Sequence, residues 1–414
     1  MSISADLTDL VKIEDPRFYL EDAYPVFARM RREAPVFHYE PLDIFVLTKH
    51  RHIREVTSNA RMWSSARGLF LQDLQFAAQM GDSGQSFVEN FFPKGGEQIG
   101  VTDPPRHAEL RRVLAPAFST RALTKIGEQL RSYCRELLDD IAPGEPVDWL
   151  EQVAAMLPIR AGSLLIGLPE TDTERLRYWS DELEKLGADV SLEDLMAAAK
   201  EFQSLQAYIA ENVEIKRANP GDDLLSWLLE AKLDDDLVSM PNVIMFAMTM
   251  IVAGSDTTRA LLAGAIWALA KHPDQMAKLV ADRSLIPSTI EESMRWVTPA
   301  RAFLRTAMQD TEIDGVPIAE GQRVYLMYMS GNRDEDVFPE PERFDITRSE
   351  SIRQLSFGSG MHMCLGARLV RVEAAVLLEE LLDRFTGIEL IAEPDPFVHV
   401  VRNSWNDMKV VFHR

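Results

Sequence analysis

A single cysteine stands where a glycine-rich turn meets the start of an apolar helical pattern. The stretch runs from Leu355 to Glu373, and Gly358 and Gly360 shortly precede Cys364. Glycine accepts positive φ angles and lets the backbone pass close to a neighbour, so that backbone N–H groups can point at one atom. These groups and the positive end of the following helix favour a thiolate, the form that binds soft metals. The residues alone leave three uses for Cys364 open: a buried inert thiol, a nucleophilic or redox thiol, and a metal ligand.

The wider pattern around the cysteine is more specific. The motif Phe-Gly-x-Gly-x-His-x-Cys-x-Gly is complete, at Phe357, Gly358, Gly360, His362, Cys364 and Gly366. It resembles the heme-binding loop of the cytochrome P-450 family. The resemblance implies heme b (iron protoporphyrin IX) as the cofactor, with Cys364 as the thiolate ligand of the iron and the other motif residues around the heme. In that family the thiolate favours cleavage of the O–O bond.

Two basic side chains four residues apart form the next candidate site. His107 and Arg111 follow Asp103-Pro104-Pro105, and proline near a helix start would place both on one helical face. That face could bind two carboxylates, although His and Arg at this spacing also occur on solvent-exposed faces. The stretch resembles the family's Asp-Pro-Pro-x-His-x-x-x-Arg element. The resemblance implies that His107, Arg111 and also Arg305 hold the heme propionates.

The longest apolar helical stretch, residues 243–271, carries a carboxylate in its middle. A charged Asp256 in a buried helix is costly unless it has a function. Gly254 can loosen the helix and threonine hydroxyls can replace backbone partners, so we expect a groove that holds oxygen and water. The run Ala253 to Thr257 resembles the family's Ala-Gly-x-Asp-Thr element. It implies that Thr257 steadies the reacting oxygen and that Asp256 relays protons to it. The alternative is that Asp256 pairs with a buried arginine.

A further group of charged residues is expected to be structural. Glu292 and Arg295 lie three apart on one predicted helical face. They resemble the family's Glu-x-x-Arg pair, which a third residue, Arg343, would complete as a buried charge cluster behind the heme. Arg301, between these motifs, could anchor an acidic substrate group, but we expect a surface or salt-bridged arginine.

The resemblance also implies a largely apolar substrate pocket. Its expected lining consists of Phe87, Phe91, Thr249, Val252, Ala253, Ala300 and Phe303. Such a pocket would take a small hydrophobic molecule of the terpenoid, steroid, fatty acid or aromatic class. Ordinary packing remains the alternative for the phenylalanines before residue 100.

Composition limits the remaining possibilities. The 414 residues are 46% hydrophobic and 26% charged, which is ordinary for a soluble globular protein. A net charge of −21 argues against nucleic acid as a partner. Cys134 and Cys364 are too few for a disulfide framework, and we see neither a leader segment nor a membrane span. We therefore expect a cytoplasmic protein that binds no membrane, and a monomer.

Periodicity predicts a mainly α protein with a small β region. A helix over residues 22–33 is followed by strands around Val36–Tyr39 and Ile44–Leu47, and amphipathic helices occupy residues 119–236. A helix is predicted from Leu365 to Phe385, with Gly387 as its C-cap. The resemblance implies the cytochrome P-450 fold, a triangular prism of helices around a buried heme, in one domain over residues 1–414.

The resemblance implies a heme-thiolate monooxygenase that inserts one oxygen atom from O2 into a C–H bond. Electrons would come from an acidic ferredoxin and its reductase, docking on a basic patch of Arg106, Arg112, Arg368 and Arg371. Two alternatives stay open. One is a peroxide-driven enzyme, which would not need the Asp256-Thr257 proton relay, and the other is a nonenzymatic heme-binding sensor.

Overall fold

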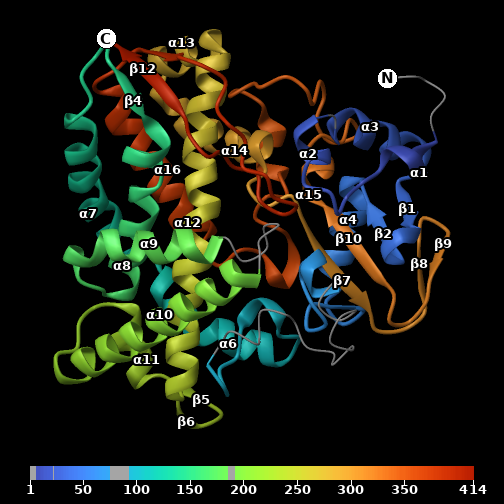
Figure 1. Ribbon diagram of the computed structural model, residues 1–414, viewed down its shortest axis with the longest axis horizontal. Helices are drawn as coiled ribbons and strands as arrows, with labels where there is room; N and C mark the ends of the chain where they lie inside the picture. The colour runs from blue at the N-terminus through green and yellow to red at the C-terminus, as the bar shows by residue number, and fades with distance from the viewer. Residues whose placement is uncertain (1–5, 22, 75–92, 185–191) are drawn as a thin grey trace.

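The protein has a large helical part and a smaller part built on a β-sheet (Figure 1). The computed structural model describes residues 6–21, 23–74, 93–184 and 192–414. The helical part surrounds α12 (Met240–Lys271), and the sheet part lies beside it with the N-terminal helices. This arrangement confirms the predicted mainly α fold with a small β region.

The helices differ widely in length. In the described residues, the longer ones are α3 (Ala23–Glu33), α7 (Thr120–Asp139), α8 (Met156–Ile166), α9 (Thr173–Glu184), α10 (Leu192–Ala218), α12, α14 (Ile286–Val297) and α16 (Ala367–Leu382). The shorter ones are α1 (Leu7–Leu10), α2 (Phe18–Glu21), α4 (His50–Ser58), α6 (Arg106–Leu114), α11 (Leu224–Glu230), α13 (Pro273–Ala281) and α15 (Tyr328–Gly331).

The main sheet has the strand order β1-β2-β10-β7-β3. Its strands are β1 (Val36–Tyr39), β2 (Ile44–Leu47), β3 (Trp63–Ser64), β7 (Ala302–Ala307) and β10 (Arg323–Met327). Strand β10 is parallel to β2 and antiparallel to β7. A second sheet has the strand order β11 (Gly387–Leu390), β12 (Lys409–His413), β4 (Pro146–Asp148). One small hairpin joins β5 (Lys232–Leu233) to β6 (Asp236–Leu237). Another joins β8 (Thr311–Ile313) to β9 (Val316–Ile318).

The main sheet is buried on both faces. In β2, Ile44 and Val46 belong to one apolar cluster, whereas Phe45 and Leu47 belong to another. Successive side chains of a strand point to opposite faces, and a strand covered on both sides needs a continuous apolar run. This explains why β2 is apolar throughout rather than alternating. The covered sheet also gives β7, the strand that carries Arg305, a rigid setting.

Helix α12 is the long apolar helix that the sequence predicts. The Ser239 hydroxyl caps its N-terminus by accepting from the Asn242 N–H, as N-cap serines do. Near its C-terminal end, a Cβ added at Gly264 would lie 2.4 Å from a methyl group of Val297 in α14, so glycine allows the two helices to approach closely. In the middle of the helix, however, Ala253 and Gly254 are exposed. The buried helix therefore has an uncovered stretch next to Asp256.

Helix α16 is shorter than predicted. It ends at Leu382 rather than Phe385, and Gly387 is not its cap but the first residue of β11, paired with His413. Phe385 continues the apolar pattern because its ring packs on Phe412 of β12, with 4.9 Å between ring centroids. The periodicity thus reflects packing on a strand beyond the helix end. Among the described helices, none has the length and apolar content that crossing a bilayer requires.

Candidate active site

The loop before α16 folds as the glycines predict. Gly358 and Gly360 have φ angles of 68° and 70°, which side chains disfavour. A Cβ at Gly360 would lie 2.0 Å from the carbonyl oxygen of Thr57 in α4, so no side chain fits there. The backbone N–H of Cys364 donates to the carbonyl oxygen of Phe357 at 2.8 Å and closes the loop. The loop therefore holds Cys364 in a fixed place just before α16 begins at Ala367.

The Cys364 thiol is in a mixed electrostatic environment. The residue is accessible, yet the protein atoms around it disfavour the charged form, and this burial raises the pKa of the thiol. The backbone N–H groups of Gly366 and Ala367 and the guanidinium groups of Arg111 and Arg371 act in the opposite direction. The expected N–H groups are thus present, but by themselves they do not overcome the cost of burial. A metal cation bound to the sulfur would supply the missing charge.

Four basic side chains from three elements form what we call the cationic cradle: His107 and Arg111 of α6, Arg305 of β7, and His362 of the cysteine loop. The rings of His107 and His362 are in contact, with 4.1 Å between their centroids. Arg111 donates to the carbonyl oxygens of Met363 at 2.8 Å and Met361 at 3.3 Å. The structure thus brings together the three predicted propionate residues and the motif histidine.

The cradle has no directly paired anion among the described residues, although the charge of Asp103 acts on His107 and Arg305. In the part of the chain that the structure describes, no ion pair links any of its four members to a carboxylate, and His107 Nδ1 and His362 Nε2 have no hydrogen-bond partner. Burial and the neighbouring cations Arg305, His107 and Arg111 lower the pKa of His362 to about 3. Burial likewise lowers the pKa of His107 and of Arg305. Buried polar groups without partners usually indicate an absent ligand, here one with negative charges.

These features fit an iron porphyrin with two propionates. Cys364 is a soft ligand of the type that heme-thiolate iron takes, and the cradle offers unpaired donors to carboxylates. Phe357, another motif residue, is buried with its ring 4.5 Å from the guanidinium carbon of Arg371. Arg371 in turn pairs with Glu291 at 2.5 Å. Phe357 is therefore fixed beside the cysteine from the side of α14.

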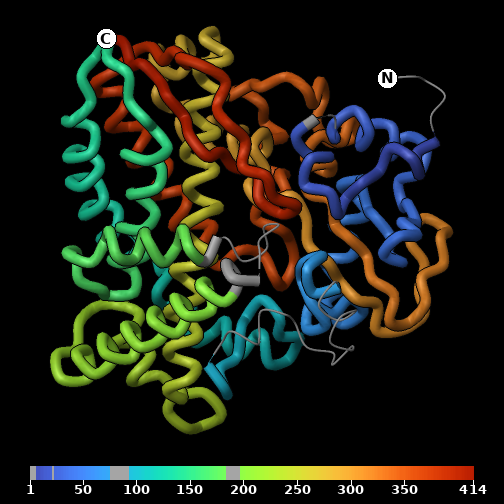
Figure 2. Tube along the Cα trace, in the orientation of Figure 1, coloured from blue at the N-terminus to red at the C-terminus, as the bar shows by residue number. Residues whose placement is uncertain are grey.

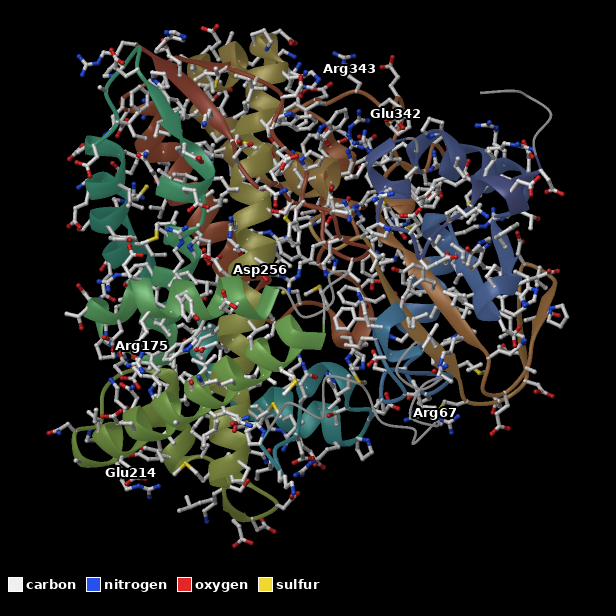
Figure 3. The ribbon with its side chains drawn as sticks, in the orientation of Figure 1. Arg67, Arg175, Glu214, Asp256, Glu342 and Arg343 are labelled. Atoms are coloured by element: carbon white, nitrogen blue, oxygen red, sulfur yellow. The ribbon has the colours of Figure 1, made fainter. Side chains whose placement is uncertain are left out.

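Asp256 lies in the middle of α12 and of the molecule (Figure 3). Its carboxylate forms an ion pair with Arg402 and accepts a hydrogen bond from Ser180 Oγ at 3.3 Å. The structure therefore contains the arginine pairing that the sequence left open as an alternative. Arg402 had no signal in the sequence, because a contact between distant segments leaves no local pattern. The Thr257 hydroxyl donates to the carbonyl oxygen of Ala253 at 3.0 Å, in its own helix.

The predicted pocket residues are in different settings. Ala253 is exposed and Val252 is half-buried on the uncovered stretch of α12, whereas Thr249 is buried and donates to the Met245 carbonyl oxygen at 2.8 Å. The half-buried ring of Phe303 lies 5.5 Å from that of Phe70 and 5.7 Å from that of Tyr328, measured between centroids. Ala300 is buried and its backbone bridges to Arg402. Phe87 and Phe91 lie outside the described residues.

The expectation for Arg301 is wrong. Its side chain is not at the surface, since the residue is 1% exposed. It also forms no ion pair with a carboxylate among the described residues, and the groups that act on its charge are tyrosines. It donates to the His399 carbonyl oxygen and, at 3.1 Å, to the Asn403 side-chain oxygen. Its guanidinium lies 4.9 Å from the centroid of the Tyr19 ring. Two oxygen acceptors and a ring thus contact the Arg301 guanidinium, while its Nε has no hydrogen-bond partner in the described part of the chain.

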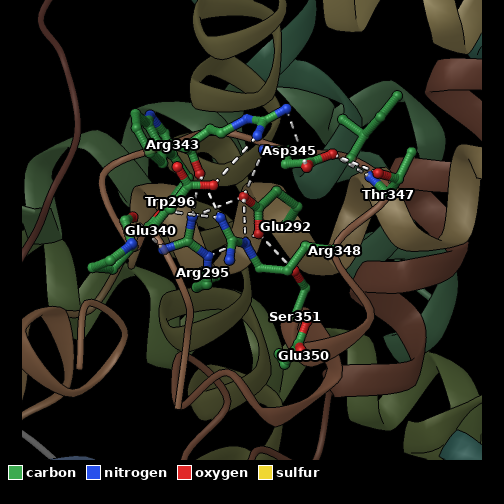
Figure 4. A network of polar contacts seen from close by, with 12 residues as sticks. Glu292, Arg295, Trp296, Glu340, Arg343, Asp345, Thr347, Arg348, Glu350 and Ser351 are labelled. Carbon is green, nitrogen blue, oxygen red and sulfur yellow. Dashed lines mark hydrogen bonds and ion pairs between the residues drawn. The ribbon is translucent and has the colours of Figure 1, made fainter. Parts of the chain in front are cut away.

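The predicted charge cluster is present, with one member changed. We call Glu292, Arg295, Arg348 and Ser351 the Glu292 cluster (Figure 4). Glu292 and Arg295 are fully buried and form a bidentate pair at 2.7 and 2.8 Å. Glu292 also accepts from Ser351 Oγ at 2.6 Å and pairs with Arg348 at 3.4 Å. Every charge in this cluster therefore has a partner within the chain.

Arg343 does not complete the cluster in the predicted way. Its side chain is 54% exposed and pairs with Glu340 and Asp345 near the edge of the molecule (Figures 3 and 4). Only its backbone takes part, because the carbonyl oxygen of Arg343 accepts from Arg295 at 3.1 Å. The side chain that reaches Glu292 belongs instead to Arg348, a residue that the resemblance did not single out.

Comparison with known proteins gives one consistent result. The sequence model of the family described as "Cytochrome P450" matches residues 190–397. The chain is 34% identical to putative cytochrome P450 126 of Mycobacterium tuberculosis, over 96% of this chain and 95% of that one. It is 31% identical to 6-deoxyerythronolide B hydroxylase of Saccharopolyspora erythraea (95% of each) and 30% identical to steroid C26-monooxygenase of Rhodococcus jostii (94% and 81%).

Solved structures show the same fold. CYP108D1 from Novosphingobium aromaticivorans aligns with a TM-score of 0.84 at 28% identity, covering 99% of this chain and 98% of the other. CYP109E1 from Bacillus megaterium, solved in complex with corticosterone, aligns with a TM-score of 0.81 at 26% identity, covering 94% and 98%.

Proposed function

The chain belongs to the cytochrome P450 family and is a heme-thiolate monooxygenase, and we propose that it inserts one oxygen atom from O2 into a C–H bond of a small hydrophobic molecule. The observation that supports the proposal most is that an accessible Cys364 lies beside a cationic cradle whose members, among the described residues, form no ion pair with a carboxylate. Since residues of α6, β7 and the cysteine loop all contribute, we also propose that residues 1–414 form one domain.

Cys364 and the cradle would hold the heme. The sulfur would ligate the iron, and His107, Arg305 and His362 would donate to the two propionates, with Arg111 bracing the loop through its bonds to Met361 and Met363. When bound, the heme would supply the iron at which O2 is activated, with two electrons from the redox partner and two protons delivered through the protein. The protein's own contribution is to fix the ligand, orient the substrate and deliver protons.

We assign proton delivery to Asp256 and Thr257 of α12. Asp256 is a buried carboxylate one residue from the Thr257 hydroxyl, beside the uncovered stretch at Ala253 and Gly254. An ionised carboxylate can take a proton from water and pass it on, and a threonine hydroxyl can both accept and donate one. Thr257→Ala should therefore divert electrons from product into hydrogen peroxide. A heme-binding sensor would show no such change, because it delivers no protons to oxygen.

The substrate class follows from the apolar surroundings. Val252, Ala253 and Phe303 are incompletely covered by protein, and Phe70 packs against Phe303. We propose a hydrophobic substrate of the terpenoid, steroid, fatty acid or aromatic class. Limonene, testosterone, lauric acid and ethylbenzene form a suitable test panel with one compound from each class, because a bound substrate displaces water from the iron and shifts the heme spectrum. A panel in which every compound leaves the spectrum unchanged would contradict this range of classes.

We propose that electrons come from an acidic ferredoxin, but on a smaller basic patch than the sequence suggests. Arg106 is neutralised by Glu97, Glu109 and Asp234, and Arg371 is paired with Glu291. Arg368 is exposed and donates to Phe118 and Thr120, and among the described residues it meets no carboxylate. Arg112 is exposed as well. Arg112 and Arg368 thus keep their charge available to a partner.

Charge reversal tests this docking site. Arg112→Glu and Arg368→Glu should slow reduction by a ferredoxin by roughly 10-fold or more at low salt, with the difference shrinking as salt screens the charges. Arg283→Glu is the matched control, since Arg283 is half-exposed and pairs with Asp383 in another region. If the control slows reduction as much as the two patch variants, the docking site is elsewhere.

A further inference from the structure

Three segments that are distant in sequence meet at Asp256. Ser180 of α9 donates to one carboxylate oxygen, and Arg402, from the loop between Pro396 and Trp405, pairs with the other. In Figure 2 the C-terminal segment runs down alongside α12, and the tip of its loop lies between the helical part and the sheet part. Asp256 is 6% exposed and Ser180 is 5% exposed, so the contacts are made inside the protein.

The loop that carries Arg402 is firmly attached. Its ends are bridged between Pro396 and Trp405, and its tip is bridged from Arg402 to Ala300. The Arg301 N–H donates to the Val401 carbonyl oxygen at 2.7 Å. Inside the loop, His399 Nδ1 accepts from the backbone N–H of Arg402 at 3.0 Å. The backbone of Arg402 is therefore fixed, and its direction toward Asp256 is a property of the fold.

Helix α9 is held against α12 by a network of charges next to Ser180. Arg259, one turn beyond Asp256, donates to Asp181 at 3.0 Å and pairs with Glu151 at 3.3 Å. Arg177 pairs with the same two carboxylates, including Asp181 at 3.6 Å. Since Asp181 follows Ser180 directly, these pairs fix the position of the Ser180 hydroxyl relative to the Asp256 carboxylate.

We propose that Arg402 and Ser180 are positioning residues that hold Asp256 ionised and correctly oriented for proton delivery. This inference rests on the proton role of Asp256 proposed above. A buried carboxylate stays charged only if opposite charge and hydrogen bonds compensate its lost hydration, and here Arg402 supplies the charge and Ser180 a hydrogen bond. Between turnovers the ionised carboxylate takes a proton from water, and it regains its charge when it passes that proton toward Thr257.

One structural consequence is that the relay needs three segments at once. The charge comes from the C-terminal loop, the hydrogen bond comes from α9, and the carboxylate comes from α12. If either α9 or the loop is displaced from α12, Asp256 loses a partner. The arrangement links proton delivery to the packing of both segments around the apolar stretch where we propose that substrate binds.

The test compares variants by the hydrogen peroxide released per NADPH oxidised, with ferredoxin and its reductase in excess. The probe is the panel compound that gives the largest spectral shift, or O2 alone if none does. Arg402→Gln should lower turnover roughly 10-fold and raise the peroxide fraction, and Arg402→Lys should recover part of both because it restores the charge. Ser180→Ala should act in the same direction with a smaller effect.

Matched controls remove the same groups elsewhere. Arg384 is 22% exposed at its side chain and pairs with Asp139 and Glu380, much as Arg402 is 19% exposed and pairs with Asp256. Ser163 is buried and donates within its helix to Ile159 at 2.8 Å. Arg384→Gln and Ser163→Ala should leave the peroxide fraction unchanged. Retention of the thiolate spectrum in each variant shows that it has folded.

A double-mutant comparison separates positioning from a general structural role. If Arg402 acts through Asp256, Arg402→Gln should add no further loss in an Asp256→Asn background, because residues that act through one another are not additive. Two results would overturn this inference alone. One is that the losses of turnover from Arg402→Gln and Asp256→Asn add in full. The other is that Asp256→Asn is impaired while Arg402→Gln behaves like the control Arg384→Gln. An Asp256→Asn variant with normal turnover would instead overturn the proposed proton role.

Discussion

The cationic cradle and the Glu292 cluster both bury basic side chains, but they differ in how these charges are balanced. In the Glu292 cluster, Arg295 pairs with Glu292 and donates to three backbone carbonyl groups, at Asn332, Pro341 and Arg343. In the cradle, the basic side chains face one another and two ring nitrogens have no partner. A balanced cluster serves the fold, whereas an unbalanced one is completed by a ligand.

The comparison predicts that the two clusters fail in different ways when mutated. Arg295→Gln should lower the free energy of unfolding by about 3–5 kcal/mol, because it leaves the fully buried Glu292 without its main partner. Denaturant unfolding of the holoenzyme measures this change. An Arg295→Gln variant as stable as the parent protein would show that the Glu292 cluster does not stabilise the fold.

The corresponding change in the cradle should affect heme retention rather than folding. Arg305→Gln should speed heme transfer to a scavenging apoglobin by roughly 10-fold or more, since a buried charge pair with a propionate is lost. Folded Arg295→Gln enzyme serves as the control and should keep its heme as well as the parent does. If Arg305→Gln retains heme like the parent, Arg305 does not contact a propionate.

Titration should distinguish the heme-free from the heme-bound cradle. Burial, with repulsion from Arg111, holds the pKa of His107 below its ordinary value of 6.5. As the pH falls, the unfolded chain therefore binds a proton at His107 at a higher pH than the folded protein does. The stability of the heme-free protein should fall as the pH drops below about 6.5. This loss of stability with falling pH should be less steep in His107→Gln. It should also be less steep in the parent protein with heme bound, because the propionates favour the protonated His107 ring.

Thermal or denaturant unfolding at several pH values checks this prediction. Other histidines with lowered pKa values, among them His50 and His399, contribute their own slope in parent and variant alike. Only the difference between parent and variant therefore reports on His107. Identical slopes would mean that His107 is not held neutral by the cradle.

The smallest effect is expected at Arg343. Its half-exposed side chain forms long pairs with the exposed Glu340 at 3.4 Å and the part-buried Asp345 at 3.7 Å. Arg343→Gln should therefore change the free energy of unfolding by no more than about 0.5 kcal/mol. Arg348→Gln should cost more, because Arg348 is 6% exposed and pairs with the buried Glu292. If the two variants rank in the opposite order in denaturant unfolding, Arg343 is the member of the cluster that matters.

The sequence predicts well where chemistry and spacing are local. Gly358, Gly360 and Cys364 lie within one turn-helix unit, and the backbone angles and contacts of that unit follow from its residue types. His107 and Arg111 share one helical face for the same reason. The apolar pattern likewise predicted α12 and the first two strands of the main sheet, β1 and β2.

Predictions from sequence fail where a side chain is satisfied by a distant segment. Arg301 can be buried because the His399 carbonyl oxygen and the Asn403 side-chain oxygen of the C-terminal loop accept from it, and nothing in its own neighbourhood encodes that loop. Arg402 likewise pairs with Asp256 in a segment that is distant in sequence, so its own neighbourhood does not encode this contact. The choice between Arg343 and Arg348 depends on how the chain turns between Pro341 and Ser351, which spacing alone cannot give.

The most direct test of the whole account concerns the bond between Cys364 and iron. Purified holoenzyme is reduced with dithionite, treated with carbon monoxide and examined for the strongly red-shifted Soret band that thiolate ligation gives. The account predicts this band in the parent protein and its loss in Cys364→Ala. Absence of the band from folded, heme-loaded parent protein, or its persistence in Cys364→Ala, would contradict the assignment of Cys364 as the ligand.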